Sequence, residues 1–249
     1  MTTRERVAAA LADAGERGVS GEALARALGV SRVAVAKHVA ALRAQGYVID
    51  ARAGTGYLLR ATPDLALPVE VGRIVRDPFW VRFEGGPSTG STNDDARVLA
   101  GLGAPEGTVV VAAEQRAGRG RLGRTWDSPG GGAYVSVLLR PGVAPVELGP
   151  LALVVGLGIA RGLETLGVEV GLKWPNDLFA GDAKLGGVLL EMAAEGDRVD
   201  WVVVGFGLNV RREGEGTPGA AYLGDLVPGA GPAAAAAAAL DGLAPTYRR

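Results

Sequence analysis

The first sixty residues show two kinds of hydrophobic pattern in succession. Apolar residues first recur every three or four positions, and Ser20 and Ser31 stand where helix caps are favoured. This pattern predicts three helices, over residues 4–14, 20–28 and 31–44. Two short apolar runs follow, over 47–50 and 56–59, and they predict a β-hairpin with Arg52 at its tip. Three helices followed by a hairpin are typical of a winged helix-turn-helix.

Beyond residue 72 the hydrophobic pattern predicts both helices and strands. It predicts a helix over 94–102 and apolar strands over 109–113 and 201–210. The polar run 88–93 before that helix is interpreted as its cap; the alternative is that it hydrogen-bonds a polar ligand. Pro63 and Pro68 bound the best linker candidate and disfavour helix on either side of it, and the alanine run 233–239 favours a last helix. The predicted organisation is a winged helix over 1–62, a linker over 63–72, a catalytic domain over 73–232 and a C-terminal helix or tail over 233–249.

Charge separates the first part from the rest. Residues 1–60 hold nine Lys and Arg against five Asp and Glu, a balance of +4 in a chain whose net charge is −1. On the third predicted helix Lys37 points away from the apolar arc and Arg32 lies in the first turn, while Arg52 belongs to the hairpin. We predict that these three residues contact DNA. The alternative is a structural module with a chance excess of charge.

Composition excludes several classes of site. The chain has no Cys and a single His, His38, which excludes disulfides, thiolate zinc sites, cysteine nucleophiles and multi-histidine metal centres. The N-terminus lacks the apolar core of a signal peptide, and we expect no stretch of the ~20 apolar residues that a membrane span needs. We therefore predict a cytoplasmic protein with no membrane partner.

A loop rich in glycine and arginine follows the predicted strand 109–113. Its glycines at 118, 120 and 123 have the spacing of a dinucleotide fingerprint, but residues 124–132 cannot form the helix that this fingerprint requires. The loop also carries Arg119, Arg121 and Arg124, and guanidinium groups pair with phosphates and carboxylates. We predict an anion-binding loop that becomes ordered when its ligand arrives. A disordered basic loop for non-specific nucleic-acid binding is the alternative.

Lysine usage marks a second cluster. The chain has three lysines, and two of them, Lys173 and Lys184, lie within twelve residues. We interpret both as positions that need an ammonium group; the alternative is that both lysines are there by chance. Asn176 and Asp177 between them offer oxygen ligands that Mg²⁺ prefers when it accompanies phosphates. Asn209 ends a glycine-containing strand and can pair with an adenine edge; the alternative is a buried strand with packing glycines. Together these features predict activation of a carboxylate by ATP through an acyl-adenylate.

The order of the motifs resembles that of the biotin protein ligases. The motifs are Ser91-Thr-Asn93, Gln115-Arg-Ala-Gly-Arg-Gly-Arg121, Lys173-Trp-Pro-Asn-Asp177, Lys184-Leu-Gly-Gly187 and Gly205-Phe-Gly-Leu-Asn209. With the N-terminal winged helix, the chain resembles the bifunctional type that is both ligase and biotin operon repressor. The resemblance implies an α+β fold with a catalytic domain like that of class II aminoacyl-tRNA synthetases, a mixed β-sheet with helices on one face.

The resemblance also implies the reaction and its residues. Biotin and ATP, with Mg²⁺, would give biotinyl-5′-AMP, and the biotinyl group would pass to a lysine of a biotin carboxyl carrier protein. The adenylate would promote homodimerisation and binding to operator DNA. Lys184 and Arg121 would be the catalytic residues. Biotin would be bound by Ser91, Thr92, Asn93, Gln115, Arg119, Gly120, Arg121 and Lys184. The adenylate would be bound by Arg119, Arg121, Trp126, Lys173, Asn176, Asp177 and Asn209, of which Asn176 and Asp177 would form the Mg²⁺ region.

One feature departs from the family pattern, and two other functions compete. The family continues after its last motif into a small SH3-like domain, which we expect to be absent here. One competing function is that of a lipoate ligase or octanoyltransferase, which shares the fold; Asp127–Tyr134 resembles part of its pattern. The other is a non-catalytic transcription factor that senses biotin or biotinyl-AMP.

Overall fold

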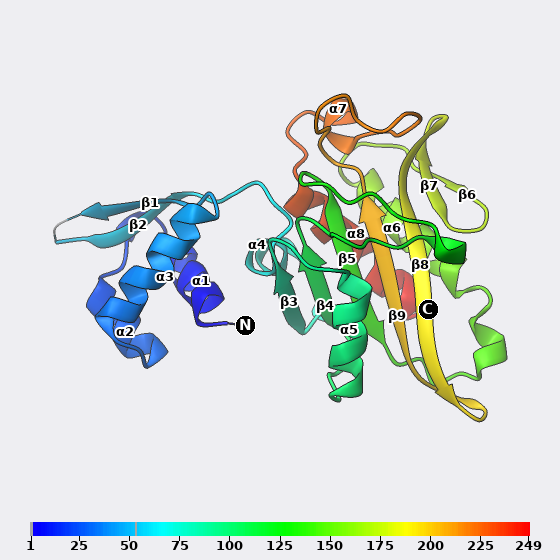
Figure 1. Ribbon diagram of the computed structural model, residues 1–249, viewed down its shortest axis with the longest axis horizontal. Helices are drawn as coiled ribbons and strands as arrows, with labels where there is room; N and C mark the ends of the chain where they lie inside the picture. The colour runs from blue at the N-terminus through cyan, green and yellow to red at the C-terminus, as the bar shows by residue number, and fades with distance from the viewer. Residues whose placement is uncertain (1, 53) are drawn as a thin grey trace. The chain divides into compact units, whose positions relative to one another are not determined.

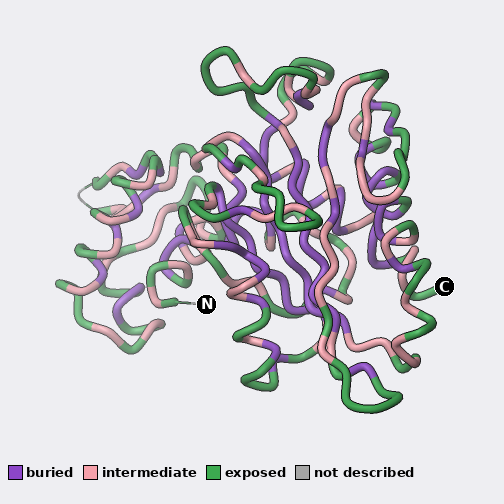
Figure 2. Tube along the Cα trace, turned by 45° about the vertical axis from the view of Figure 1, so that its right-hand side comes forward, coloured by how far each residue is buried: buried purple, intermediate pink, exposed green. Residues whose placement is uncertain are grey.

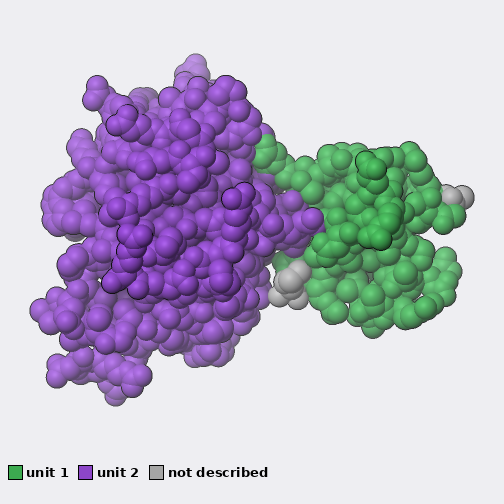
Figure 3. Space-filling view, turned by 180° about the vertical axis from the view of Figure 1, so that it is seen from behind, with its two compact units in different colours: residues 1–64 green, residues 65–249 purple. Residues whose placement is uncertain are grey.

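The protein folds into two compact units, residues 1–64 and 65–249 (Figure 3). The structure is a computed structural model that describes residues 2–52 and 54–249. The division falls inside the predicted linker 63–72. The last residues of that predicted linker belong to helix α4 (Pro68–Ile74), whose Val69 and Val71 are buried in the second unit. The expectation that Pro68 disfavours helix on its far side is wrong, because proline is accepted in the first turn of a helix, where its missing N–H costs no hydrogen bond.

The first unit is a three-helix winged fold. Its elements are α1 (Thr3–Ala14), a 3₁₀ turn (Gly15–Arg17), α2 (Gly21–Leu28), α3 (Arg32–Ala44), β1 (Val48–Arg52) and β2 (Gly56–Ala61) (Figure 1). The predicted caps are confirmed: Ser20 Oγ accepts from Ala23 N at 3.0 Å and Ser31 Oγ accepts from Ala34 N at 3.1 Å. Each cap satisfies a backbone N–H that the first helical turn leaves unpaired.

The hairpin is longer than predicted. β1 and β2 pair antiparallel up to Arg52 opposite Gly56, so Arg52 is the last residue of a strand and not the tip of a loop. Its guanidinium lies 3.5 Å from Asp50, and the same carboxylate bonds Arg60 at 2.9 Å. These bonds hold the pKa of Asp50 below its ordinary value, chiefly through Arg60.

The second unit is built on a seven-stranded mixed sheet in the order β3-β4-β5-β9-β8-β7-β6. β3 and β4 are parallel and every other pair is antiparallel. The strands are β3 (Arg82–Gly86), β4 (Thr108–Ala112), β5 (Ala133–Leu139), β6 (Gly171–Lys173), β7 (Asp177–Ala180), β8 (Ala183–Glu195) and β9 (Arg198–Leu208). The predicted α+β class and mixed sheet are confirmed.

Helices cover both faces of this sheet. The larger core lies between one face and the helices α6 (Leu151–Glu164) and α8 (Pro232–Tyr247) (Figure 1). Figure 2 shows the buried chain in purple through the middle of this unit. On the other face α5 (Thr92–Gly101) packs Ala96 and Ala100 against Val110. Alternate residues of β4 therefore face opposite cores, as strand geometry requires. The expectation of helices on one face is wrong, because α5 fills the second. A short helix, α7 (Leu223–Leu226), precedes α8.

Helices α6 and α8 approach each other through glycines. A Cβ on Gly162 would overlap the main chain at Ala238, and one on Gly242 would overlap Gly158 and Gly162. The segment 145–164, which includes α6, is long and apolar enough to cross a membrane by length and composition, so the expectation that no stretch reaches this length is wrong. Val155, Ile159 and Leu163 of α6 are instead fully buried in the core of the unit.

The last helix is also bonded to the first part of the second unit. Asp241 Oδ1 accepts hydrogen bonds from the main-chain N–H groups of Arg76 and Asp77 at 2.9 and 3.0 Å. Trp80 Nε1 donates to the carbonyl of Leu240 at 2.9 Å, and Arg248 pairs with Asp77 at 2.6 Å. The predicted C-terminal helix is thus an integral part of the core.

Candidate active site

A cavity of 440 Å³ opens at the side of the sheet where α5, the glycine-arginine loop and the β7–β8 hairpin meet. It gathers every predicted site residue of the second unit except Lys173 and Asn209. The residues brought together are Ser91, Thr92, Asn93, Gln115, Arg119, Gly120, Arg121, Trp126, Asn176, Asp177 and Lys184. Segments far apart in sequence therefore converge on one concave site, as ligand pockets require.

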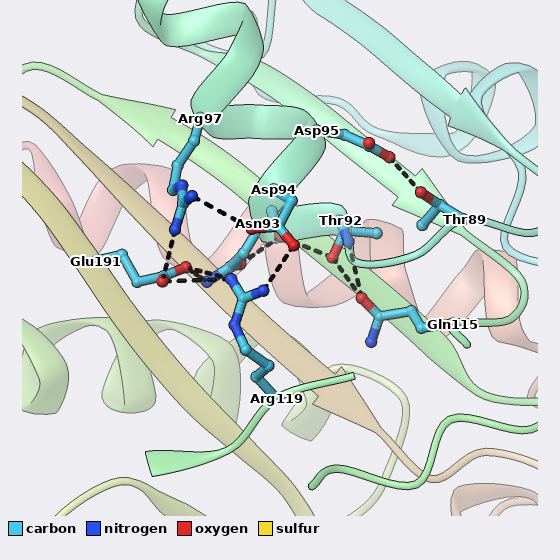
Figure 4. Close-up of polar contacts among 10 residues, drawn as sticks. Thr89, Thr92, Asn93, Asp94, Asp95, Arg97, Gln115, Arg119 and Glu191 are labelled. Atoms are coloured by element: carbon cyan, nitrogen blue, oxygen red, sulfur yellow. Dashed lines mark hydrogen bonds and ion pairs between the residues drawn. The ribbon is translucent and has the colours of Figure 1, made fainter. Parts of the chain in front are cut away.

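The polar run before α5 forms one wall of this cavity. Helix α5 begins at Thr92, two residues earlier than predicted, and Ser91 occupies its N-cap position without a side-chain cap bond. Gln115 Oε1 accepts from Thr92 N at 2.8 Å and from Thr92 Oγ1 at 3.0 Å (Figure 4). Gln115 Nε2 donates to Ser128 Oγ at 3.0 Å. The run is therefore part of a polar network and not a simple cap.

Ser136 on β5 joins this wall to Asn93. Its Oγ lies 2.6 Å from Asn93 Oδ1 and 2.7 Å from Thr92 Oγ1, and all three side chains are buried. Buried polar groups need partners, so these bonds hold the amide and hydroxyls in fixed orientations. Ser136 was not among the predicted site residues, because a single serine in an apolar strand carries no local signal.

The two glycines of β9 make room for protein side chains. A Cβ on Gly205 would overlap the amide of Asn93, and one on Gly207 would lie 2.5 Å from Trp126 Nε1. The two strand glycines therefore make close packing contacts, and both also line the cavity. Trp126 Nε1 is buried and is without a hydrogen-bond partner within residues 2–52 and 54–249.

Lys184 contributes a positive charge to the cavity. Its Nζ lies 2.7 Å from Asp177 Oδ1 and 5.1 Å from the centre of the Trp126 ring. The carboxylate and the ring face both favour an ammonium. The carboxylate comes from the start of β7, which pairs with β8 in an antiparallel hairpin.

The glycine-arginine loop crosses the cavity in an irregular conformation. It contains a short 3₁₀ turn (Arg121–Gly123), and Leu122 within this turn has φ 55° and is 88% exposed. A left-handed non-glycine residue stores strain, and such residues concentrate at functional sites. Among the described residues neither Arg121 nor Arg124 forms an ion pair; Arg121 has one long contact, 3.5 Å, to Asn176 Oδ1.

Arg119 differs from the other loop arginines because it is paired twice. Its NH1 bonds Asp94 at 2.6 Å and its NH2 bonds Glu191 at 3.1 Å (Figure 4). The hydrogen bond from Arg119 holds the pKa of Asp94 below its ordinary value, and the same bond raises the pKa of Arg119. Asp94 and Glu191 were not among the predicted site residues; Glu191 lies 72 residues from Arg119, so only the fold reveals the pair.

Two predicted site residues lie outside the cavity lining. Lys173 is exposed and its Nζ sits 4.8 Å from the centre of the Phe179 ring. Asn209 Nδ2 donates to the carbonyl of Lys184 at 3.1 Å, and the main chain of Asn209 bonds Leu185 and Leu223. Asn209 therefore forms hydrogen bonds both to the start of β8 and to the first residue of α7.

Oxygen ligands for Mg²⁺ are few at this site. No group of three or more His, Cys, Asp or Glu capable of holding a metal occurs in the part of the chain that the structure describes. Asp177 is paired with Lys184, and Asn176 Nδ2 donates to the carbonyl of Val188 at 2.7 Å. These residues do not fit a metal site made by protein alone, so an ion here would depend on phosphate oxygens. The Mg²⁺ assignment stays a prediction.

The first unit has a hollow of its own between α3 and the hairpin. It is lined by Gly21, Arg32, Val33, Ala36, Ala51, Arg52, Gly56 and Tyr57. Arg32 and Arg52 thus face one surface, whereas Lys37 is exposed on α3 outside this lining. Val33 beside them is 80% exposed, so the helix presents an apolar side chain together with the cationic ones.

Both units match known families. Residues 85–209 match the Biotin/lipoate A/B protein ligase family, and residues 3–58 match an HTH domain. The chain is 36% identical over 220 residues to the bifunctional ligase/repressor BirA of Bacillus spizizenii, covering 87% of this chain and 68% of that protein. It is 35% identical over 199 residues to the BirA of Escherichia coli, covering 77% of this chain and 59% of that protein. The chain thus spans about three fifths to two thirds of these relatives.

Solved structures resemble the second unit. A biotin protein ligase from Aquifex aeolicus, in complex with biotin and ATP, superposes with a TM-score of 0.56 at 32% identity, covering 68% of this chain and 71% of that one. A biotin protein ligase from Leishmania major in complex with biotinyl-5-AMP gives a TM-score of 0.57 at 29% identity, covering 68% and 76%. The predicted fold class therefore agrees with solved relatives.

Proposed function

This chain belongs to the biotin protein ligase family, in the form that carries an N-terminal helix-turn-helix repressor domain, and we propose how its residues perform the reaction. The proposed substrates are biotin, ATP and a lysine of a biotin carboxyl carrier protein. The observation that supports the proposal is the convergence of Lys184, Arg121 and the Thr92–Gln115–Asn93 network on one cavity.

The polar network fits the ureido ring of biotin. That ring offers one carbonyl acceptor and two N–H donors, and Asn93, Thr92 and Ser91 supply hydroxyl and amide groups that match both kinds. The bonds from Gln115 to Thr92 and from Ser136 to Asn93 leave these groups little freedom to turn. A site organised before binding loses less entropy when the ligand arrives.

The chemistry occurs in two steps at the cationic end of the cavity. A carboxylate oxygen of biotin attacks the α-phosphorus of ATP, the bond to the β-phosphate breaks, and pyrophosphate leaves. The Lys184 ammonium and the Arg121 guanidinium neutralise the charge that develops on the α-phosphate. In the second step the amine of the carrier lysine attacks the biotinyl carbonyl, loses a proton, and AMP leaves.

The enzyme assignment is tested against a sensor that binds biotinyl-AMP without transferring it. Mass spectrometry of a carrier-protein fragment incubated with this chain, biotin and MgATP is expected to show the mass of one added biotinyl group on one lysine. Adenylate formation without transfer would favour the sensor. Replacing biotin with lipoate or octanoate in the same assay tests the third candidate, and product from either acid in place of biotin would favour it.

Arg121→Gly is expected to release biotinyl-AMP from the cavity, so that lysines of bystander proteins become biotinylated about tenfold faster or more. Among the residues that the structure describes, Arg121 has a single long side-chain contact, to Asn176, and it faces the cavity, so its charge-assisted bonds are available for the adenylate. Blotting a mixture of carrier protein and serum albumin measures the effect. Arg161→Gly, a change at an exposed arginine of α6, is the control. Labelling that stays confined to the carrier in the Arg121 variant would contradict the clamp.

We propose that the first unit binds operator DNA as a ligand-promoted homodimer in the cytoplasm. Support comes from the winged fold, its cationic hollow and the helix-turn-helix match. A single helix-turn-helix makes few contacts, and two half-sites require two copies. Biotin and ATP are therefore expected to tighten DNA binding.

Lys37→Ala and Arg52→Ala are each expected to weaken DNA binding while adenylate synthesis stays unchanged. If each cation contacts a phosphate, the salt dependence should flatten by about one unit per lost contact. Fluorescence anisotropy on DNA upstream of biotin synthesis genes measures both quantities. Arg26→Ala is the matched control, because Arg26 lies on α2 in an exposed pair with Glu22. Equal affinity of the unmutated protein for that DNA and for random DNA would disprove the repressor assignment.

A further inference from the structure

A line of four hydrogen-bonded side chains leads from the cavity to a carboxylate on β8. We call it the Thr92 relay, and it consists of Thr92, which lines the cavity, Ser136 on β5, Asn93 on α5 and Glu191 on β8. The first three of these residues are at most 4% exposed. Each of their polar atoms therefore needs a hydrogen-bond partner in the protein or in a ligand.

Glu191 sets the direction of the hydrogen bonds at one end of the relay. Asn93 Nδ2 donates to Glu191 Oε2 at 2.7 Å (Figure 4). A carboxylate accepts hydrogen bonds and cannot donate one, so only one of the two orientations of the Asn93 amide makes this bond. Asn93 Oδ1 consequently faces Ser136 Oγ at 2.6 Å and takes the single hydrogen of that hydroxyl.

The hydroxyl of Thr92 lies at the other end of the relay. Because Ser136 gives its hydrogen to Asn93, the 2.7 Å contact between the two hydroxyl oxygens of Ser136 and Thr92 requires the hydrogen of Thr92. Gln115 Oε1, at 3.0 Å, is a second acceptor for the same hydrogen. Both acceptors belong to the protein, so Thr92 Oγ1 presents lone pairs, and no hydrogen, to the cavity that it lines.

We propose that Glu191 is a positioning residue that determines specificity, because it acts through Asn93 and Ser136 to keep Thr92 Oγ1 a hydrogen-bond acceptor. The ligand that fits is an acid whose ring carries an N–H donor at this point, as a cyclic urea does. An acid without such an N–H, such as lipoate or octanoate, would bury Thr92 Oγ1 without a partner, at a cost of about tenfold in affinity. The inference rests on the proposed ligase function and supplies a reason for its choice of biotin over those two acids.

Glu191→Gln is expected to reverse the relay. Arg97 donates to Glu191 Oε1 at 3.3 Å, and Arg119 donates to both oxygens at 3.3 and 3.1 Å. After the substitution these arginines hold the one remaining oxygen, so the introduced NH2 group faces Asn93. Two N–H donors cannot bond each other, so the Asn93 amide turns over and donates to Ser136. Ser136 then donates to Thr92 Oγ1, and the hydrogen of Thr92 can turn toward the cavity.

Calorimetry of biotin binding in the absence of ATP tests the relay. Biotin is compared with two analogues, in each of which one ureido N–H is replaced by CH2. The unmutated protein is expected to bind at least one analogue about tenfold more weakly than biotin, and Glu191→Gln is expected to reduce that ratio to within about twofold for one of them. Unchanged ratios for both analogues would overturn the proposal. A protein that binds no biotin at all would refute the ligase function and the relay together.

Two controls separate the relay from the loss of a negative charge. Asp94→Asn removes the carboxylate that pairs with Arg119 at 2.6 Å and has no printed bond to Asn93. Glu195→Gln removes an exposed carboxylate further along β8. Both variants are expected to keep the unmutated ratios, and a collapse of the ratio in either would assign the effect to charge and contradict the proposal.

Ser136→Ala interrupts the relay between Asn93 and Thr92, which makes a double-variant test possible. In the Ser136→Ala background, adding Glu191→Gln is expected to change the analogue ratios by less than about twofold, because the carboxylate no longer reaches Thr92 through hydrogen bonds. If Glu191→Gln changes the ratios equally with and without the Ser136 hydroxyl, then Glu191 acts by another route and the proposal is wrong.

Discussion

Lys184→Gln is expected to slow adenylate formation by about 10²–10³-fold without unfolding the protein. The ammonium lies in the cavity beside Asp177 and over the Trp126 ring, where a biotin carboxylate and an α-phosphate must both approach. Glutamine keeps the length of much of the side chain but cannot neutralise charge. Release of pyrophosphate, with biotin and MgATP at saturating concentration, measures the effect.

Lys173→Gln is the comparison that makes this result specific. Both lysines stand in the recognised motifs, but Lys173 is exposed over Phe179 and does not line the cavity. Lys173→Gln is expected to change the rate of adenylate formation by less than about threefold. If the two substitutions lower the rate of pyrophosphate release equally, then lying inside or outside the cavity does not determine which lysine takes part in the reaction. Pyrophosphate release near the normal rate in Lys184→Gln would refute the catalytic assignment.

Gly162→Ala is expected to destabilise the second unit by about 2 kcal/mol, although alanine favours helix over glycine by about 1 kcal/mol. The added Cβ would overlap the carbonyl of Ala238 and approach the main chain of Ala239, so helix α8 would have to move away from α6. Backbone atoms cannot rotate aside as a side chain does. The loss of close packing along two long helices therefore exceeds the gain in helix propensity.

Urea unfolding followed by tryptophan fluorescence measures this loss in the second unit alone, because all four tryptophans, Trp80, Trp126, Trp174 and Trp201, lie beyond residue 64. Gly149→Ala is the matched control. Gly149 has helical φ and ψ of −49° and −46°, and an added Cβ meets nothing within 4 Å. That change is expected to be neutral or to stabilise by up to about 1 kcal/mol. A midpoint for Gly162→Ala equal to that of Gly149→Ala would contradict the packing argument.

Local signals in the sequence predicted much of the fold. Ser20 and Ser31 cap helices because a cap depends on residues three positions away, and such patterns are readable along the chain. The motifs that carry Gln115, Arg121 and Lys184 likewise converge as the resemblance implied. Contacts between distant segments were not predicted. α5 covers the second face of the sheet because Ala96 and Ala100 meet Val110, and no local pattern shows which face a short helix will take.

Contacts between distant segments also explain why the sequence did not predict the roles of Glu191 and Asn209 at the site. Glu191 bonds Asn93 and Arg119 across 98 and 72 residues, and a carboxylate on a half-exposed strand has no pattern that distinguishes it from a solvated one. Asn209 lies just beyond β9, which ends at Leu208 and not at the predicted residue 210, and its amide is turned toward the carbonyl of Lys184. Which partner a polar side chain finds depends on the tertiary fold, and residue type alone predicts only that it needs one.

The position of α8 in the core affects how the protein is made. The larger core includes Ala235, Ala239 and Leu240 of this helix, and Asp241 bonds the main chain at residues 76 and 77. The core of the first unit does not need α8. The buried residues among 2–52 and 54–64 lie in or next to that unit's own helices and strands. During synthesis at about 5–20 residues per second the first unit can fold roughly 10–40 s before the ribosome delivers the helix that completes the second. For that interval each nascent chain carries a folded helix-turn-helix unit beside a second unit whose core still lacks α8, and it is the stage at which chaperones would be expected to engage the chain.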